Sequence, residues 1–199
     1  MSRSEKLSTK NIVLIAVCTV LLIILEMLGS VFSWVLGTYG HSLSQGFSGF
    51  LSAIVMVFLL YKIPKRFVFS FSFLLLLAIY AMGSFYIPWI ISFIVGLALG
   101  ELALGLFGYR SFLGQAIAYG CVHLGSACGQ FIPAWFFPEP FVEHFVNTDM
   151  TNAEQMHMFV QHAHGVAGFF AVLITFGLPI VGVYLARQVL KRYLPKVVA

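Results

Sequence analysis

Apolar residues fill most of the chain in long runs, and short polar segments separate one run from the next. A membrane-spanning helix needs about 20 predominantly apolar residues, and the runs approach or exceed that length. The first run follows Arg3, Lys6 and Lys10, as in a signal peptide, but it is long and lacks a small-x-small cleavage site, so we expect it to be retained. The pattern predicts six transmembrane helices, over residues 11–28, 42–61, 67–82, 85–107, 112–137 and 164–190.

Composition favours a membrane protein over a soluble one. The 199 residues are 60% hydrophobic and 9% charged, whereas an ordinary soluble domain is about 25% charged. The net charge of +4 could suit nucleic acid, but the basic residues flank the predicted spans, where orientation alone explains them. We therefore expect an all-α membrane protein, one domain over residues 1–199, with the lipid bilayer and no nucleic acid as a partner.

The eleven Lys and Arg residues predict the topology. Three precede the first span, three lie between the second and third, one lies between the fourth and fifth, and four lie at the end of the chain. The alternate connections have none. Because cytoplasmic loops collect Lys and Arg, we expect both termini in the cytoplasm and residues 138–164 outside.

Residues 138–164 form the one long polar excursion, with four of the seven acidic residues, four of the six histidines and no Lys or Arg. We interpret this stretch as an outward-facing loop or lid between the fifth and sixth helices. His162 and His164 stand at the mouth of the sixth helix, where they are candidate ligands of a metal or a haem iron. The alternative is an amphipathic lid whose histidines face water.

Glu26, Glu101 and His123 lie within predicted spans. A charged side chain there costs at least about 2.5–3.5 kcal/mol on insertion scales, so Glu26 and Glu101 each need a reason. Glu26 either lines an outward pocket or sits at the headgroup boundary, whereas Glu101 is expected to pair with a neighbouring helix or a partner subunit. His123 either bonds to a neighbouring helix or contacts a ligand.

Catalytic motifs are few. Gly46-Phe47-Ser48-Gly49 matches the G-x-S-G around the serine of rhomboid-type intramembrane proteases, which makes an intramembrane serine hydrolase an alternative. A second alternative is a membrane haem protein with His123 and His164 as axial ligands. The chain has no H-E-x-x-H and no Walker A motif, so it has no signature of a zinc protease or of an ATPase.

Several short motifs carry a resemblance that covers nearly the whole chain. The spacings Gly96-xxx-Gly100 and Gly125-xxx-Gly129 predict close helix packing rather than a direct ligand role. The chain resembles the Trep-Strep family of bacterial integral membrane proteins, which is assigned to the substrate-binding S components of energy-coupling factor (ECF) transporters. The residues that carry this resemblance are Lys62-x-Pro64-Lys65, Gly100-Glu101-Leu102, Gly108-Tyr109-Arg110-Ser111 and Ala118-Tyr119.

The resemblance implies a multi-pass protein of the bacterial cell membrane that binds a vitamin-like micronutrient and is not itself an enzyme. Its partners would be a transmembrane coupling subunit and two cytoplasmic ATPases. In that group the pocket opens outward, and an alanine-xxx-alanine surface on the first helix meets the coupling subunit; Ala16-x-x-x-Val20 is the nearest match here. Haem is a candidate cargo. The candidate ligand contacts are Glu26, Tyr39, His41, His123, Gln130, Trp135, His162 and His164.

Overall fold

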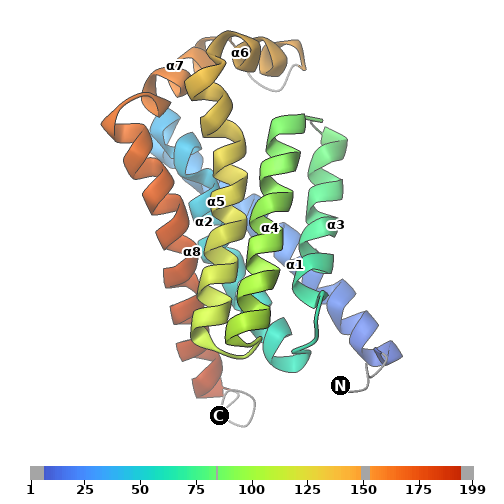
Figure 1. Ribbon diagram of the computed structural model, residues 1–199. Helices are drawn as coiled ribbons and strands as arrows, with labels where there is room; N and C mark the ends of the chain where they lie inside the picture. Colours follow the sequence, from blue (N-terminus) through green and yellow to red (C-terminus); the bar gives the residue numbers. More distant parts are fainter. Residues whose placement is uncertain (1–6, 84, 149–152, 194–199) are drawn as a thin grey trace.

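The computed structural model describes residues 7–83, 85–148 and 153–193, and every regular element in these ranges is helical. Figure 1 shows their arrangement. The elements are α1 (Thr9–Ser33), the short 3-10 helix η1 (Trp34–Leu36), α2 (Gly37–Lys62), α3 (Val68–Gly83), α4 (Ile87–Phe107), α5 (Phe112–Phe136), α6 (Pro138–Asn147), α7 (Ala153–Ala163) and α8 (Val166–Tyr193). The prediction of an all-α protein is confirmed.

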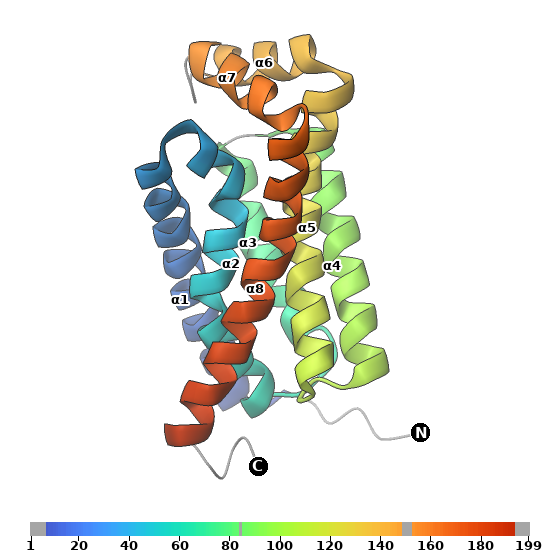
Figure 2. The same ribbon diagram turned by 90° about the vertical axis from the view of Figure 1, so that its left-hand side faces the viewer.

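Six of these helices, α1 to α5 and α8, run side by side along the bundle, and each coincides with one predicted apolar run (Figures 1 and 2). Helices α1, α4 and α8 and the segment Ser42–Lys62 of α2 are long and apolar enough to cross a membrane. Helix α3 has only 16 residues, and α5 carries more small and polar residues. The protein is therefore a multi-pass membrane protein, while the count of six crossings stays a prediction.

The two ends of the bundle differ in charge. One end of the bundle lies opposite α6 and α7 (Figure 1). It holds the start of α1, the end of α8, and the α2–α3 and α4–α5 connections. We call this the basic end. The orientation of the basic end towards the cytoplasm stays a prediction. The described Lys and Arg residues all belong to its helix ends and connections: Lys10, Lys62, Lys65, Arg66, Arg110, Arg187, Lys191 and Arg192.

Glycines let the helix backbones touch. A Cβ atom on Gly96 would lie 2.4 Å from the main-chain oxygen of Cys121, and one on Gly125 would lie 2.6 Å from that of Ser92. Helices α4 and α5 therefore cross with no side-chain layer between them, which confirms the packing predicted from their small-xxx-small spacings. Gly29 of α1 has the same role against α2, because its Cβ atom would lie 2.5 Å from Ser48 Cα.

The stretch predicted as a loop or lid is mostly helical. Helices α6 and α7 lie across the end of the bundle opposite the basic end, and we call this pair the cap (Figure 2). Their apolar faces bury Phe141 and Phe159, whose rings stack at 5.6 Å, and Phe159 also meets Phe131 of α5 at 5.4 Å. Apolar contacts hold the cap onto the bundle, and its acidic residues Glu139, Glu143 and Glu154 remain exposed, whereas His144 is partly buried.

Candidate functional site

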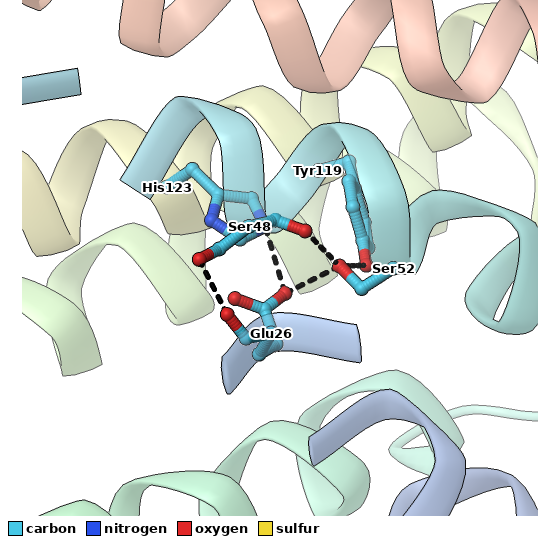
Figure 3. A network of polar contacts seen from close by, with 5 residues as sticks. All are labelled: Glu26, Ser48, Ser52, Tyr119 and His123. Atoms are coloured by element: carbon cyan, nitrogen blue, oxygen red, sulfur yellow. Dashed lines mark hydrogen bonds and ion pairs between the residues drawn. The ribbon is translucent and has the colours of Figure 1, made fainter. Parts of the chain in front are cut away.

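A cluster of polar side chains is buried in the middle of the bundle, between α1, α2 and α5 (Figure 3). It consists of Glu26 from α1, Ser48 and Ser52 from α2, and Tyr119 and His123 from α5, and each is at most 3% exposed. Residues four apart lie on one face of a helix, so the two serines face the same way, as do the tyrosine and the histidine. We call these five residues the core cluster.

Ser52 stands at the centre of the core cluster. Its hydroxyl oxygen forms a short hydrogen bond with the Glu26 carboxyl group and lies 2.7 Å from the Tyr119 hydroxyl. The same oxygen lies 2.7 Å from the main-chain oxygen of Ser48, one turn earlier in α2. Ser48 donates its own hydroxyl to the main-chain oxygen of Glu26 at 2.7 Å. These bonds join α1, α2 and α5 at one level (Figure 3).

His123 approaches Glu26 from α5. Its Nε2 atom lies 3.5 Å from Glu26 Oε1, and the backbone of Gln45 is beside the ring. Within the described part of the chain, neither ring nitrogen makes a hydrogen bond of ordinary geometry. The ring fits against Gly49, where a Cβ atom would lie 2.6 Å from Nε2. His123 is therefore fully buried and has spare capacity to bond or to accept a proton.

Among the described residues, no Lys or Arg side chain compensates the core cluster. The described Lys and Arg side chains belong to the basic end, whereas Glu26 is the eighteenth of the 25 residues of α1. Burial of an unpaired carboxylate is expensive, so the group must be neutral, share charge with His123, or meet a ligand. The core cluster can therefore hold a proton or bond to a polar group.

A second polar cluster surrounds Glu101 near the basic end. Its carboxylate accepts from the Phe67 backbone N–H at 2.9 Å and from the Ser70 hydroxyl at 2.6 Å, and the Tyr109 hydroxyl completes the set. Burial and the bond to Glu101 raise the pKa of Tyr109. Because Phe67 precedes α3, the carboxylate of α4 caps a helix N-terminus that would otherwise keep unpaired donors. Glu101 thus contacts a neighbouring helix, which is one of its two predicted roles.

Arg187 of α8 ties the same end together. It donates to the main-chain oxygen of Arg110 at 2.8 Å and to Gln115 Oε1 at 3.1 Å, and its guanidinium lies 5.2 Å from the ring of Tyr61. The Gln115 amide in turn donates to the main-chain oxygen of Tyr109 at 2.8 Å. The motif 108–111 that carries the family resemblance is therefore fixed in place by α5 and α8.

The cap rests on Tyr86, the residue that precedes α4. The Tyr86 ring lies 4.6 Å from His144, 5.2 Å from Phe145 and 6.0 Å from Phe141, all in α6. Burial raises the pKa of Tyr86 to about 12, so this tyrosine stays neutral over the physiological range. At the other side of the cap, Trp135 of α5 donates its indole N–H to the main-chain oxygen of Ala163 at 2.6 Å.

The structure brings some of the predicted ligand contacts together and leaves others apart. Glu26 and His123 meet inside the bundle, where Glu26 is 2% exposed. Gln130 and Trp135 lie further along α5, nearer the cap. Tyr39 and His41 are in the first turns of α2, and their side chains lie outside the described residues.

The candidate metal ligands do not converge. The Nδ1 atom of His162 lies 2.7 Å from the main-chain oxygen of Met158, and that of His164 lies 2.8 Å from Val160 O, so each ring faces its own helix. His164 is exposed between α7 and α8, whereas His123 is in the middle of α5, so the structure does not place them as a facing pair. Among the described residues, no three His, Cys, Asp or Glu side chains gather where a metal ion could bind.

The remaining candidates have clear positions. Ala16 and Val20 lie on the exposed side of α1, where a partner helix can reach them. Ser48, the serine of the G-x-S-G motif, uses its hydroxyl on Glu26 main-chain oxygen, and no hydrogen bond joins it to His123 in the described structure. A serine hydrolase needs that serine–base contact, so the geometry lends this alternative no support.

Ser52 and Tyr119 are the two members of the core cluster that we did not predict as site residues. The available signal was the spacing: Ser48 and Ser52 are four apart in one apolar run, as are Tyr119 and His123 in another. Polar pairs at this spacing place two hydrogen-bonding groups on the same face of a membrane helix, and such faces seek partners inside the bundle.

A family model described as a hypothetical bacterial integral membrane protein (Trep_Strep) matches residues 9–196. No curated protein and no solved structure matches the chain.

Proposed function

Because the chain belongs to the Trep_Strep family of bacterial integral membrane proteins, we propose that it is the substrate-binding S subunit of an ECF-type ABC transporter. In this proposal the protein takes up a vitamin-like micronutrient. It is not itself an enzyme, since a transmembrane coupling subunit and two cytoplasmic ATPases would supply the energy. The name of the family states no function, so the proposal depends on the architecture and on the resemblance of the motifs.

The cap is the observation that carries the proposal. It places two amphipathic helices across the end of the bundle opposite the basic end, and an aromatic cluster lies beneath them. If the basic end faces the cytoplasm, the cap faces outward, where an uptake protein meets its cargo. Aromatic side chains beneath a cap suit a flat, partly apolar molecule, and a few polar groups would fix its orientation.

Trp135 is the residue on which we centre the ligand site. It belongs to the aromatic cluster beneath the cap and also bonds to the end of α7. Gln130 lies just over one turn earlier in α5, and His162 and His164 follow in the cap and its junction with α8. Together with Tyr39 and His41 these residues would surround the cargo, and Glu26 and His123 would lie deeper in the bundle.

The cargo can be distinguished by the role of the histidines. A tetrapyrrole such as haem would use His162 or His164 as an iron ligand, whereas a neutral vitamin would use them only as hydrogen-bonding groups. Haem added to the purified protein should shift the Soret band if iron is ligated. An identical shift in a His162→Ala, His164→Ala double variant would remove these two residues as ligands.

The decisive experiment is to isolate the protein from its native membrane and identify the proteins and the small molecule that accompany it. The proposal expects a transmembrane coupling subunit and two ATPases, and a small molecule that raises the melting temperature when it is added back. Substitution of the exposed Ala16 and Val20 by Trp should reduce recovery of the coupling subunit without loss of cargo binding.

A matched pair of variants tests the ligand site. Trp135→Ala removes the aromatic side chain under the cap and should abolish the ligand-induced rise in melting temperature. Phe136→Ala changes the next residue, which is 69% exposed, and should leave that rise intact. Recovery of the protein without these partners, together with the absence of stabilisation by any vitamin or tetrapyrrole, would contradict the proposed function.

A further inference from the structure

The hydrogen bonds of the Ser52 hydroxyl group determine whether the Glu26 carboxyl group carries a hydrogen. The Ser52 hydroxyl oxygen has three oxygen neighbours: Glu26 Oε1, Tyr119 OH and the main-chain oxygen of Ser48. A hydroxyl group donates one hydrogen and accepts at most two. The main-chain oxygen of Ser48 carries no hydrogen, so the 2.7 Å contact to it must use the hydrogen of Ser52.

The other two contacts must then bring their own hydrogens. The Tyr119 hydroxyl supplies one of them. The remaining contact, with Glu26, requires a hydrogen on the carboxyl group. If Glu26 were ionised, Ser52 would have to donate its hydrogen to the carboxylate. The Ser52 hydroxyl oxygen and the Ser48 main-chain oxygen would then lie 2.7 Å apart with no hydrogen between them.

The surroundings of Glu26 agree with this count. The titratable groups near it are His123 and Tyr119 of α5 and Tyr80 of α3, and none of these carries a fixed positive charge. The charged side chains of the other helices packed in the bundle lie towards the basic end: Lys62 of α2, Glu101 of α4, and Arg187, Lys191 and Arg192 of α8. A neutral carboxylic acid avoids the cost of an unpaired buried charge.

His123 offers the proton a second position. Its Nε2 atom lies 3.5 Å from the same oxygen, Oε1, that the count marks as protonated. Transfer breaks the O–H bond of Glu26 and forms an N–H bond on His123, which leaves a carboxylate beside an imidazolium. The pair has no net charge before or after the transfer, so the proton can move without bringing a net charge into the bundle.

We infer that the core cluster is a proton-binding site, in which Glu26 holds one exchangeable proton, Ser52 orients it, and His123 is its neighbouring acceptor. The ligand class of this site is thus a proton and not a metal ion. The inference rests on the contacts of these residues and does not depend on the proposed transport function.

Infrared spectroscopy of the purified protein in detergent or lipid tests the inference directly. A protonated carboxyl group gives a C=O stretching band that is separate from the bands of a carboxylate. Wild-type protein at neutral pH should show this band, with a small shift in D₂O, and Glu26→Gln should lack it. Glu101→Gln is the matched control and should retain the band, because the Glu101 carboxylate already accepts three hydrogens from its neighbours.

Ser52→Ala provides a second variant in case Glu26→Gln does not fold. It removes the acceptor of the Glu26 proton, so the band should persist and move to higher wavenumber as the hydrogen bond is lost. Absence of the band from wild type, or an unchanged band in Glu26→Gln, would overturn the inference. Stabilisation of the wild type by added Na⁺ that is lost in Glu26→Gln would also overturn it, since the cluster would then be a cation site.

Discussion

Glu26 in α1 and Glu101 in α4 are the same side chain in two helices of one bundle, but their neighbours supply hydrogens in different ways. Glu101 receives an N–H from Phe67 and hydroxyl hydrogens from Ser70 and Tyr109. Glu26 meets the single hydroxyl of Ser52, whose hydrogen is directed to a main-chain oxygen. The Glu101 carboxyl group receives three hydrogens from its neighbours, whereas the one hydroxyl bonded to Glu26 has its hydrogen engaged elsewhere.

The difference shows that the position of a carboxyl group along a membrane helix does not decide its role. The Glu101 cluster closes the start of α3, where unpaired backbone donors attract a negative charge. The core cluster lies between helix sides, where the backbone groups are already paired within each helix. A carboxyl group between the sides of helices has to be protonated to form its hydrogen bonds, whereas one beside a helix N-terminus can accept hydrogen bonds from free backbone N–H groups.

The largest expected effect comes from moving His123 away from Glu26. Gly49→Ala places a methyl group where a Cβ would lie 2.5 Å from His123 Cδ2 and 2.7 Å from Pro179 Cγ. We expect a destabilisation of up to about 3 kcal/mol, as for other overpacked cores. Thermal unfolding in detergent measures it. Gly105→Ala is the control, since nothing lies within 4 Å of its Cβ position, and there alanine should stabilise α4 by about 0.5–1 kcal/mol.

The two glutamates themselves can be compared by one substitution. Glu101→Gln places an amide N–H₂ group, itself a donor, against the donors of the Glu101 cluster. We therefore expect a loss of about 2 kcal/mol in the free energy of unfolding. Glu26→Gln keeps the shape of a protonated carboxyl and still donates to Ser52, so its stability should stay within about 1 kcal/mol of wild type. Equal melting temperatures for the two variants, or a lower one for Glu26→Gln, would contradict the proposed difference between the two clusters.

Removal of one donor at Glu101 should have a smaller effect. Tyr109→Phe deletes the hydroxyl that bonds to Glu101 but leaves the Phe67 and Ser70 donors in place. We expect a loss of about 1 kcal/mol in the free energy of unfolding. Tyr184→Phe, at an exposed position of α8, serves as the control and should be neutral. An equal loss in both variants would mean that the Tyr109 hydroxyl contributes nothing specific.

The smallest effect is a dependence on alkaline pH. The pKa values of Tyr86 and Tyr109 are raised in the folded protein, so above about pH 10 the unfolded chain loses these protons first. Stability should therefore fall as pH rises from about 10 towards the higher folded pKa values. Melting temperatures of wild type and a Tyr86→Phe, Tyr109→Phe variant should approach each other over this range. A constant difference between them would contradict the linkage.

The helices of the bundle could be predicted because each apolar run has a physical reason to be a helix in lipid. The cap was predicted only as a polar stretch, because its apolar residues are interspersed with charged and polar ones in two helices too short to cross a membrane. Phe141 and Phe145 in α6, and Met156, Phe159 and Ala163 in α7, recur at three- and four-residue intervals and mark the buried faces of two short helices.

The core cluster was only half predictable. Glu26 and His123 are conspicuous in apolar runs, but their meeting depends on how α1 and α5 each pack against α2. The position of α1 on α2 is set by close contacts such as the one between Gly29 and the backbone of Ser48. Serine and tyrosine are common in membrane helices, so the residue types of Ser52 and Tyr119 alone did not mark them as site residues.

The close crossing of α4 and α5 has a consequence for the bilayer. Backbone contact at Gly96 and Gly125 leaves no side-chain layer that could compress or slide. Helix α4 has 21 residues, and at about 1.5 Å per residue it spans about 31 Å, close to the hydrocarbon thickness of a typical membrane. This helix pair therefore acts as a spacer of fixed length. In a thinner or thicker bilayer the surrounding lipid must deform to match the protein, at a fraction of a kcal/mol per Å of mismatch.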